Sequence, residues 1–174
     1  MKVINLFAGP GAGKSTLAYG VSYFLKKKGV KVEYVHEEAK ELVWEERAKT
    51  LECQPYIFSK QMRNLWRLKG KVDVVVTDSP ILLSLLYEKP GMFPKSFSKY
   101  VIDQFNEFDN LNFFLRRRKT YNSIGRVQTA KEALELDANL ADLLVKNDIK
   151  IAFMSGPRDN DDNAAVKNVL RYLD

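Results

Sequence analysis

The segment that most constrains this chain is GPGAGKST, residues 9–16, because it lies between two stretches of different hydrophobic periodicity. Residues 3–7 are short and mostly apolar, which is typical of a strand buried on both faces. Residues 14–28 carry apolar side chains at helical spacing, and Gly29 ends that pattern. A strand, a glycine-rich turn and a helix start in this order predict an anion-binding loop rather than a chance run of glycines.

The composition of this loop fits phosphate binding. Glycines let consecutive backbone N–H groups point at an anion, and the helix N-terminus adds partial positive charge. We expect Lys14 to reach the β- and γ-phosphates of a nucleotide and the Ser15 hydroxyl to ligate Mg²⁺. Ala8 stands where the pattern usually begins with glycine, so the first bend departs from it. The predicted nucleotide-binding residues are Gly9, Gly11, Ala12, Gly13, Lys14, Ser15 and Thr16.

The rest of the chain alternates short apolar strands with helices, which predicts a single three-layer α/β domain over residues 1–174. A strand, a helix and a strand within about 35 residues form a crossover unit, so we expect a parallel sheet. Thr129 and Glu132 form a capping-box pattern at the start of a helix. The other predicted strands are 30–35, 72–77, 112–115 and 150–154, and the helices are 38–51, 55–68, 80–87, 96–108, 129–146 and 163–173.

Charge and cysteine content narrow the class of protein. The 28 Lys and Arg against 22 Asp and Glu give a net charge of +6, which favours polyanionic partners, either nucleic acid or phosphorylated small molecules. The one cysteine, Cys53, excludes an internal disulfide and a multi-cysteine zinc site, and it fits a reducing cytoplasm. No apolar stretch approaches the ~18 residues of a membrane span, and no signal peptide is visible, so we expect a soluble, cytoplasmic protein.

Carboxylates follow two of the predicted strands, at the edge where ligands collect in parallel α/β sheets. Glu37 and Glu38 follow the second strand, and Asp78 follows the apolar run 74–76 and Thr77. An acid after such a strand is the Walker B pattern, in which it lies by Mg²⁺. We assign Glu37 to an acceptor hydroxyl and Asp78 to Mg²⁺ or the base, and these two roles could be exchanged. Helix capping is the alternative for Asp78, and a solvated first-turn acid is the alternative for Glu37 and Glu38.

The stretch between Asp109 and Glu132 contains no acidic residue but several cations. Arginine offers a rigid fork of donors to phosphate, so Arg118 and Arg126 are candidate phosphate-binding residues. Arg116 should share a face with Arg118 if the strand continues. The others we interpret as a solvated charged surface: Arg117, Lys119 and Lys131.

The chain resembles P-loop kinases of the nucleoside and nucleotide monophosphate kinase type, and more narrowly small kinases of tailed bacteriophages related to ribosylnicotinamide kinases. The resemblance spans nearly the whole chain and is carried by AGPGAGKST (8–16), EEAKELVWE (37–45), KGKVDVVVTDSP (69–80) and FFLRRRKTYNSIGRVQT (113–129). It implies a three-layer α/β/α fold with five parallel strands in the order 2-3-1-4-5 and ATP with Mg²⁺ as donor. It also implies a mobile arginine-bearing lid at about 116–129, whose closure would bring Arg118 and Arg126 onto the transferring γ-phosphoryl group.

The resemblance also suggests roles for single residues. Glu37 aligns with the acid of an E-x-A-K element, and the helix at 55–68 would line the acceptor pocket. On that helix Gln61 and Arg63 could bind an acceptor base or its phosphate, and Glu38 and Arg116 are further candidate substrate-binding residues. Arg158, after the fifth strand, could stack on the adenine of ATP.

We therefore expect an ATP-dependent phosphotransferase with a nucleotide-type acceptor. The favoured acceptor is the 5-hydroxymethyl group of 5-hydroxymethyluracil in phage DNA, a step toward hypermodified thymidine, which would place the protein in the host cytoplasm. Two basic tracts, the arginine segment and the one on helix 55–68, support a DNA acceptor. A free deoxynucleoside or nucleoside monophosphate is the alternative acceptor. The other alternative is a P-loop ATPase without an acceptor site.

Overall fold

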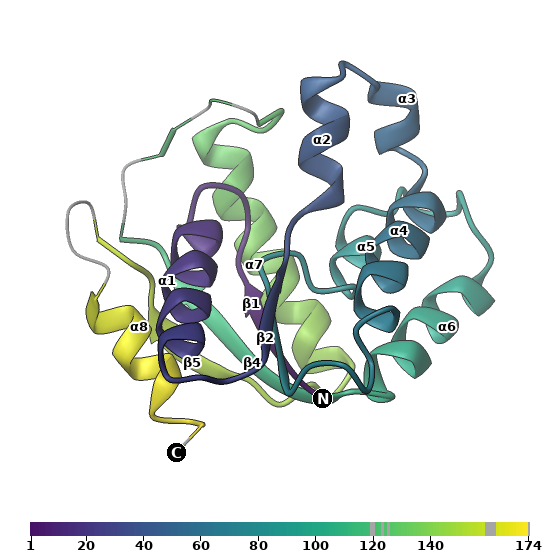
Figure 1. Cartoon of the computed structure of the whole chain (residues 1–174). Coiled ribbons are helices and arrows are strands. Elements are labelled where there is room, and N and C mark those ends of the chain that lie inside the picture. Colours follow the sequence, from purple (N-terminus) through teal and green to yellow (C-terminus); the bar gives the residue numbers. More distant parts are fainter. Residues whose placement is uncertain (119–120, 123, 125, 159–162, 174) are drawn as a thin grey trace.

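The computed structural model describes residues 1–118, 121–122, 124, 126–158 and 163–173, and Figure 1 shows its arrangement. Five parallel strands form one sheet in the order β2-β3-β1-β4-β5, as the resemblance implied. The strands are β1 (Lys2–Phe7), β2 (Val32–Val35), β3 (Val74–Thr77), β4 (Asp109–Arg116) and β5 (Ala152–Ser155). Each is fully or partly buried, and apolar residues predominate in β1 and β3, as expected for strands covered on both faces.

Helices cover both faces of the sheet and complete the three layers (Figure 1). On one face α1 (Lys14–Lys27) and α8 (Asn163–Leu170) pack against the strands around Leu17, Phe113 and Val169. The opposite face is built around Phe7, Leu65 and Leu140. Its helices are α4 (Gln54–Trp66), α5 (Leu83–Leu86), α6 (Lys95–Asn106) and α7 (Ala130–Lys146).

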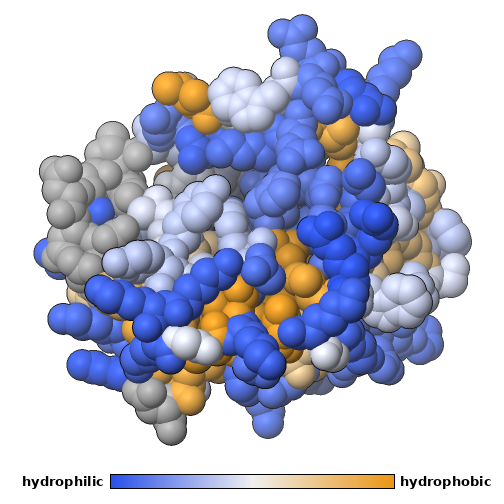
Figure 2. Space-filling model, in the orientation of Figure 1, coloured by the Kyte–Doolittle hydropathy of each residue, from blue (hydrophilic) through white to orange (hydrophobic). Residues whose placement is uncertain are grey.

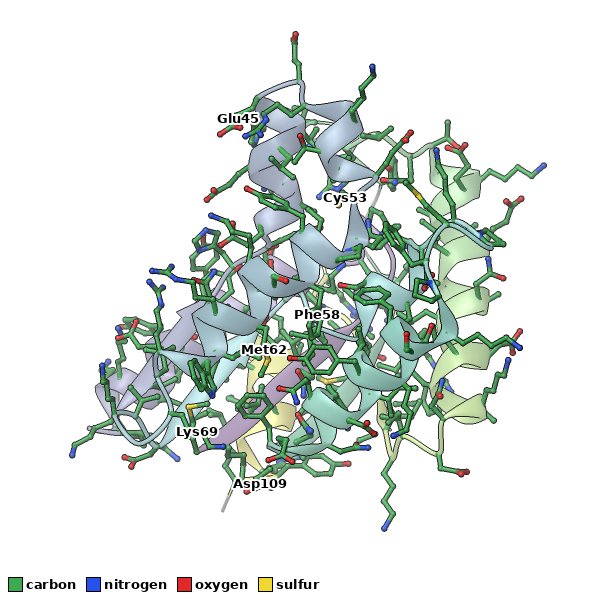
Figure 3. The ribbon with its side chains drawn as sticks, turned by 90° about the vertical axis from the view of Figure 1, so that its right-hand side faces the viewer. Glu45, Cys53, Phe58, Met62, Lys69 and Asp109 are labelled. Atoms are coloured by element: carbon green, nitrogen blue, oxygen red, sulfur yellow. The ribbon has the colours of Figure 1, made fainter. Side chains whose placement is uncertain are left out.

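Aromatic contacts fix α4 against α6. The ring of Phe58 lies edge-on to Phe97 and Tyr100, with ring centroids 5.9 and 5.7 Å apart. Figure 3 shows Phe58 and Met62 on α4, which starts just after Cys53. This packing sets the position of α4 beside the carboxyl ends of β2 and β3.

The predicted helix over 38–51 is wrong, because two helices occupy this stretch: α2 (Glu38–Trp44) and α3 (Ala48–Leu51). Glu46 adopts a left-handed backbone with φ 56° and ends α2. The Glu46 N–H donates to the Val43 carbonyl and the Arg47 N–H to the Leu42 carbonyl, which is the Schellman pattern of a helix C-terminus. Both helices stand above the carboxyl end of the sheet in Figure 1.

Other elements follow the sequence pattern closely. The capping box at Thr129 and Glu132 is present and starts α7. Gly29, with φ 81°, ends the turn after α1 as expected.

Most of the face drawn in Figure 2 is hydrophilic, with an apolar area in its lower middle, where Figure 1 places the edge strand β2. Within the part of the chain that is described, no helix is both long and apolar enough to span a bilayer.

Candidate functional site

The phosphate loop, residues 8–16, leaves β1 and enters α1 with two glycines in left-handed conformations. Gly11 has φ 80° and Gly13, the residue before α1, has φ 93°. The Lys14 ammonium turns back and donates to the carbonyls of Ala8 at 2.9 Å and Gly9 at 3.1 Å. Burial lowers the pKa of Lys14, which is held beside the loop rather than in bulk solvent.

Ser15 and Asp78 meet at the start of α1, where β3 ends. The Ser15 hydroxyl donates to Oδ2 of Asp78 at 2.5 Å. Asp78 is only 2% exposed, and its Oδ1 has no hydrogen-bond partner among the described residues. Unsatisfied carboxylate and hydroxyl oxygens are the donor set that Mg²⁺ prefers. No cluster of three or more His, Cys, Asp or Glu occurs in the described ranges, so a metal here would complete its shell with phosphate and water.

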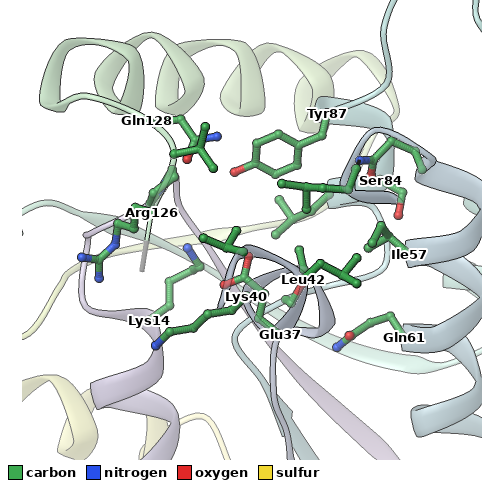
Figure 4. A pocket seen from close by; sticks show the side chains of 18 of the residues that line it. Lys14, Glu37, Lys40, Leu42, Ile57, Gln61, Ser84, Tyr87, Arg126 and Gln128 are labelled. Carbon is green, nitrogen blue, oxygen red and sulfur yellow. Dashed lines mark hydrogen bonds between the residues drawn. The ribbon is translucent and has the colours of Figure 1, made fainter. Parts of the chain in front are cut away.

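Glu37 stands at the N-cap position of α2, makes no capping hydrogen bond through its side chain, and faces the same space as Lys14 (Figure 4). Burial raises the pKa of its carboxyl group, Lys14 opposes the shift, and the charge of Asp78 adds to it. A carboxylate whose pKa is moved toward neutrality is better matched to take a proton from a hydroxyl.

A cavity of about 810 Å³, the main cavity, opens beneath the phosphate loop and is enclosed by α2, α3, α4, α5 and residues 126–128. Its walls combine apolar side chains, with Leu42, Ile57 and Ile81 among them, and many polar or charged ones. Gln61 on α4 and Tyr87 after α5 are polar side chains that line it from separate elements (Figure 4). A cavity of this size, with apolar surface and convergent polar groups, is typical of a small-molecule site.

Gln61 is 2% exposed and is held by its amide N–H₂ group. That group donates to the carbonyl of His36 at 3.2 Å and to Oγ1 of Thr77 at 3.4 Å. Its carbonyl oxygen Oε1 has no partner within the described residues. A buried amide with one end fixed and the other unsatisfied is suited to bind a ligand's hydrogen-bond donor.

A smaller cavity of about 230 Å³, the side cavity, shares Ser15, Glu37 and Lys40 with the main cavity. Asp78 lies in its wall together with Tyr19, Tyr34, His36 and Trp44. The rings of Tyr19 and Tyr34 meet edge-on with centroids 4.8 Å apart. Burial and the charge of Asp78 raise the pKa of Tyr34. These aromatic walls were not anticipated from the sequence.

The structure gathers several of the predicted site residues around the main cavity: Gly11, Gly13, Lys14, Ser15, Thr16, Glu37, Gln61 and Arg126. Ala12 is buried beneath the loop, where its carbonyl approaches Gly156 of the loop after β5. The Gly9 N–H donates to Oδ1 of Asp137 at 2.5 Å, so this amide faces α7 rather than the cavity.

Other candidates lie apart from both cavities. Glu38 accepts from the amide of Asn64, and its Oε2 is 4.0 Å from the Lys60 ammonium. Arg116 is exposed and lies over the ring of Phe153, 5.6 Å from its centroid. The remaining three are exposed side chains that line neither cavity: Arg63, Arg118 and Arg158.

The side chains in and next to the predicted lid, residues 116–129, lie in different environments. The Arg126 guanidinium reaches the main cavity, lies 5.8 Å from the centroid of Tyr121 and donates to the carbonyl of Asn122. Lys131 is exposed as expected and is 3.9 Å from Glu135. Lys119 and Gly125 lie outside the described residues.

The interpretation of Arg117 as a solvated residue is wrong. Its side chain is only 17% exposed, and Nε donates to Oδ2 of Asp137 at 2.5 Å. Nη1 donates to the carbonyl of Pro10 and Nη2 to that of Ala133. Strand alternation is the signal that could have found it, because Arg117 must face opposite to Arg116 and Arg118.

Comparison with known proteins gives matches only among solved structures. No protein-family model matches the chain, and no curated protein matches it either. A structure of deoxyadenosine kinase from M. mycoides with bound dATP is 16% identical, with a TM-score of 0.52 and 99% coverage of both chains. A second structure of that enzyme, with the products dCMP and a flexible dCDP, is 19% identical, with a TM-score of 0.54 and coverage of 99% of this chain and 98% of that chain. The chain therefore has the fold of a P-loop nucleoside kinase.

Proposed function

We propose that the chain is an ATP-dependent kinase that phosphorylates a hydroxyl group of a nucleoside-type acceptor bound in the main cavity. The observation that carries this proposal is that Lys14 of the phosphate loop and the carboxylate of Glu37 face the same cavity. A volume of about 810 Å³ has room for a nucleoside next to a phosphate chain. The shared fold with a deoxyadenosine kinase supports the same class of reaction.

Positioning is the main task in phosphoryl transfer, and the residues of the cavity divide that task. The unsatisfied Oε1 of Gln61 would accept a hydrogen bond from the acceptor base, while Ile57 and Leu42 cover its faces. The acceptor hydroxyl would then lie at Glu37, at the end of the cavity nearest the phosphate loop.

Glu37 would take the proton of the acceptor hydroxyl as its oxygen bonds to the γ-phosphorus and the bond to the β-phosphate oxygen of ATP breaks. Lys14 and Arg126 would neutralise charge on the transferring group and on ADP. Ser15 and Asp78 would hold Mg²⁺, which when bound supplies charge neutralisation at the phosphates. Asp78 as the base remains the alternative, but Glu37 lines the main cavity and Asp78 lines the side cavity.

A second candidate acceptor is 5-hydroxymethyluracil within phage DNA, and the side cavity is the observation that favours it. This cavity has aromatic walls and shares Ser15, Glu37 and Lys40 with the main cavity. A base that neighbours the acceptor in a polynucleotide could stack there, as bases do on aromatic side chains in single-strand binding proteins. A free nucleoside would fill the main cavity alone.

Transfer of labelled γ-phosphate from ATP tests these proposals. The acceptors are purine and pyrimidine deoxynucleosides, their monophosphates, and DNA oligonucleotides that contain thymine or 5-hydroxymethyluracil. Label on a nucleoside or nucleotide supports the first candidate, and label only on the hydroxymethylated DNA supports the second. Label released solely as inorganic phosphate would refute both and leave an ATPase. Lys14→Ala is the inactive control.

A further inference from the structure

Four hydrogen bonds tie the first turn of the phosphate loop to α7 and to the base of the lid segment. Asp137 on α7 accepts from the Gly9 N–H at 2.5 Å through Oδ1 and from Arg117 at 2.5 Å through Oδ2. Arg117 in turn donates to the carbonyls of Pro10 and Ala133, the latter at 3.0 Å. Both charged side chains are only 17% exposed. We call Arg117 and Asp137 the bracket.

We infer that the bracket holds the phosphate loop in its nucleotide-binding conformation, so that Arg117 and Asp137 are positioning residues for ATP; this inference rests on the proposed function. A trans peptide is planar, and its C=O and N–H groups point in opposite directions. The Pro10 carbonyl is fixed on Arg117. The Gly11 N–H, which belongs to the same peptide, is therefore turned away from Arg117.

The carbonyl groups of the two preceding residues of the loop are also held by hydrogen bonds. Lys14 takes the carbonyls of Ala8 and Gly9, and Arg117 takes the carbonyl of Pro10, so two cations hold three consecutive carbonyls. Pro10 has no N–H to offer, and Ala8 lacks the freedom of the usual glycine. The first bend of the loop is thus fixed by two side chains, Lys14 from the end of the loop and Arg117 from beyond β4.

Close packing at Gly9 shows how tightly the loop lies against the bracket. A Cβ atom at this position would lie 2.7 Å from the Ala133 carbonyl oxygen, 2.9 Å from Nη2 of Arg117 and 3.0 Å from Oδ1 of Asp137. Only glycine lets the loop approach the bracket this closely. The first turn therefore rests directly against the ion pair.

The bracket predicts how its variants behave. Removal of one partner leaves the other charge buried and unpaired, so either single variant should disturb the loop as fully as the double variant does. Because the two residues act as one unit, Arg117→Ala, Asp137→Ala and the double variant should each weaken ATP binding by about tenfold rather than multiply their effects. The Km for the acceptor should stay near the wild-type value, since neither side chain lines the main cavity.

The experiment measures hydrogen exchange of the loop peptides in the nucleotide-free protein, and the Kd for ATP with Mg²⁺ by calorimetry. Asp137→Asn keeps the size of the side chain and serves if an alanine variant fails to fold. Lys131→Ala removes an exposed cation near the start of α7 that lines neither cavity, and it is the matched control. Faster exchange at residues 9–13 and a raised ATP Kd in the bracket variants alone support the inference.

Unchanged exchange at residues 9–13 in folded Asp137→Asn and Arg117→Ala would overturn the inference, as would an ATP Kd that stays within about twofold of wild type. A wild-type protein that binds ATP but phosphorylates no acceptor would refute the proposed function alone. Hydrogen exchange needs no nucleotide, so the two failures are distinguishable.

Discussion

Two groups of opposite charge, Lys14 and Glu37, are both held where burial disfavours their charged forms. The pKa of Lys14 is lowered and the pKa of Glu37 is raised, in each case chiefly by burial. Such shifts are a cost to folding at neutral pH, because the unfolded chain hydrates both charges freely. A cost of this kind at the mouth of a cavity is common at functional sites.

The stability of Glu37→Gln should reveal this cost. Glu37 binds its proton more tightly in the folded chain than in the unfolded one, whose pKa is near 4.5. This tighter proton binding stabilises the folded chain fully below pH 4.5, and the stabilisation is lost as the pH rises through the folded pKa of Glu37. Glu37→Gln should therefore have a higher Tm than wild type at pH 8, by a margin that shrinks toward pH 4.5. Thermal unfolding at both pH values checks this, and a lower Tm for the variant at pH 8 would contradict it.

The pH dependence of phosphate transfer follows from the same two groups. The rate should fall on the acid side as Glu37 takes up its proton, with a midpoint above 4.5. It should fall on the alkaline side as Lys14 loses its charge, with a midpoint below 10.5. Initial rates across this range measure both limbs. An acid limb that persists unchanged in the residual activity of Glu37→Gln would assign it to another group.

Elements whose ends are marked by glycine or by a capping box could be predicted from the sequence, and those without such marks could not. Gly29 and the pair Thr129 and Glu132 gave the end of one helix and the start of another. The break between α2 and α3 carries neither signal, because Glu46 occupies the left-handed position that glycine usually takes. Hydrophobic periodicity alone therefore predicted one continuous helix over residues 38–51.

Glu46→Gly tests that explanation. A non-glycine residue in the left-handed region costs roughly 1–2 kcal/mol, part of which is offset by the greater freedom of glycine when unfolded. The substitution should raise the free energy of unfolding by about 0.5–1 kcal/mol in denaturant titrations. Glu45→Gly is the matched control, because Glu45 has right-handed helical angles, and it should lower stability. Equal effects of the two substitutions would contradict the structural cause.

On the scale of the whole molecule, the candidate site assembles where the carboxyl ends of β1, β2 and β3 meet. Parallel strands place their ends at one edge, so Lys14, Glu37 and Asp78 could be expected near one another from the sequence. Tertiary packing decides the rest. The cavity walls come from four helices, and the burial of Arg117 depends on an acid twenty residues away on α7. Strand alternation could have indicated that Arg117 points inward, but no local pattern in the sequence identifies Asp137 as its partner or the helices that form the cavity walls.

The basic residues also differ in what they do once the chain is folded. Lys14 and Arg126 line the main cavity, Arg117 binds the phosphate loop, and Arg63 and Arg118 are exposed. The net charge of +6 is therefore not a uniform attraction for polyanions. It separates into groups at the cavity, groups that shape the loop, and solvated groups.

Single-turnover transfer of labelled γ-phosphate, with the ATP Kd measured in parallel, tests the central claim most directly. The comparison is between wild type, Glu37→Gln and the control Glu38→Gln, with the best acceptor from the panel. Loss of a general base lowers the rate by about 10²–10⁴-fold, so Glu37→Gln should transfer at least about 100-fold more slowly with its ATP Kd nearly unchanged. Transfer by Glu37→Gln at more than about a tenth of the wild-type rate would contradict the assignment of Glu37 and of the main cavity as the acceptor site.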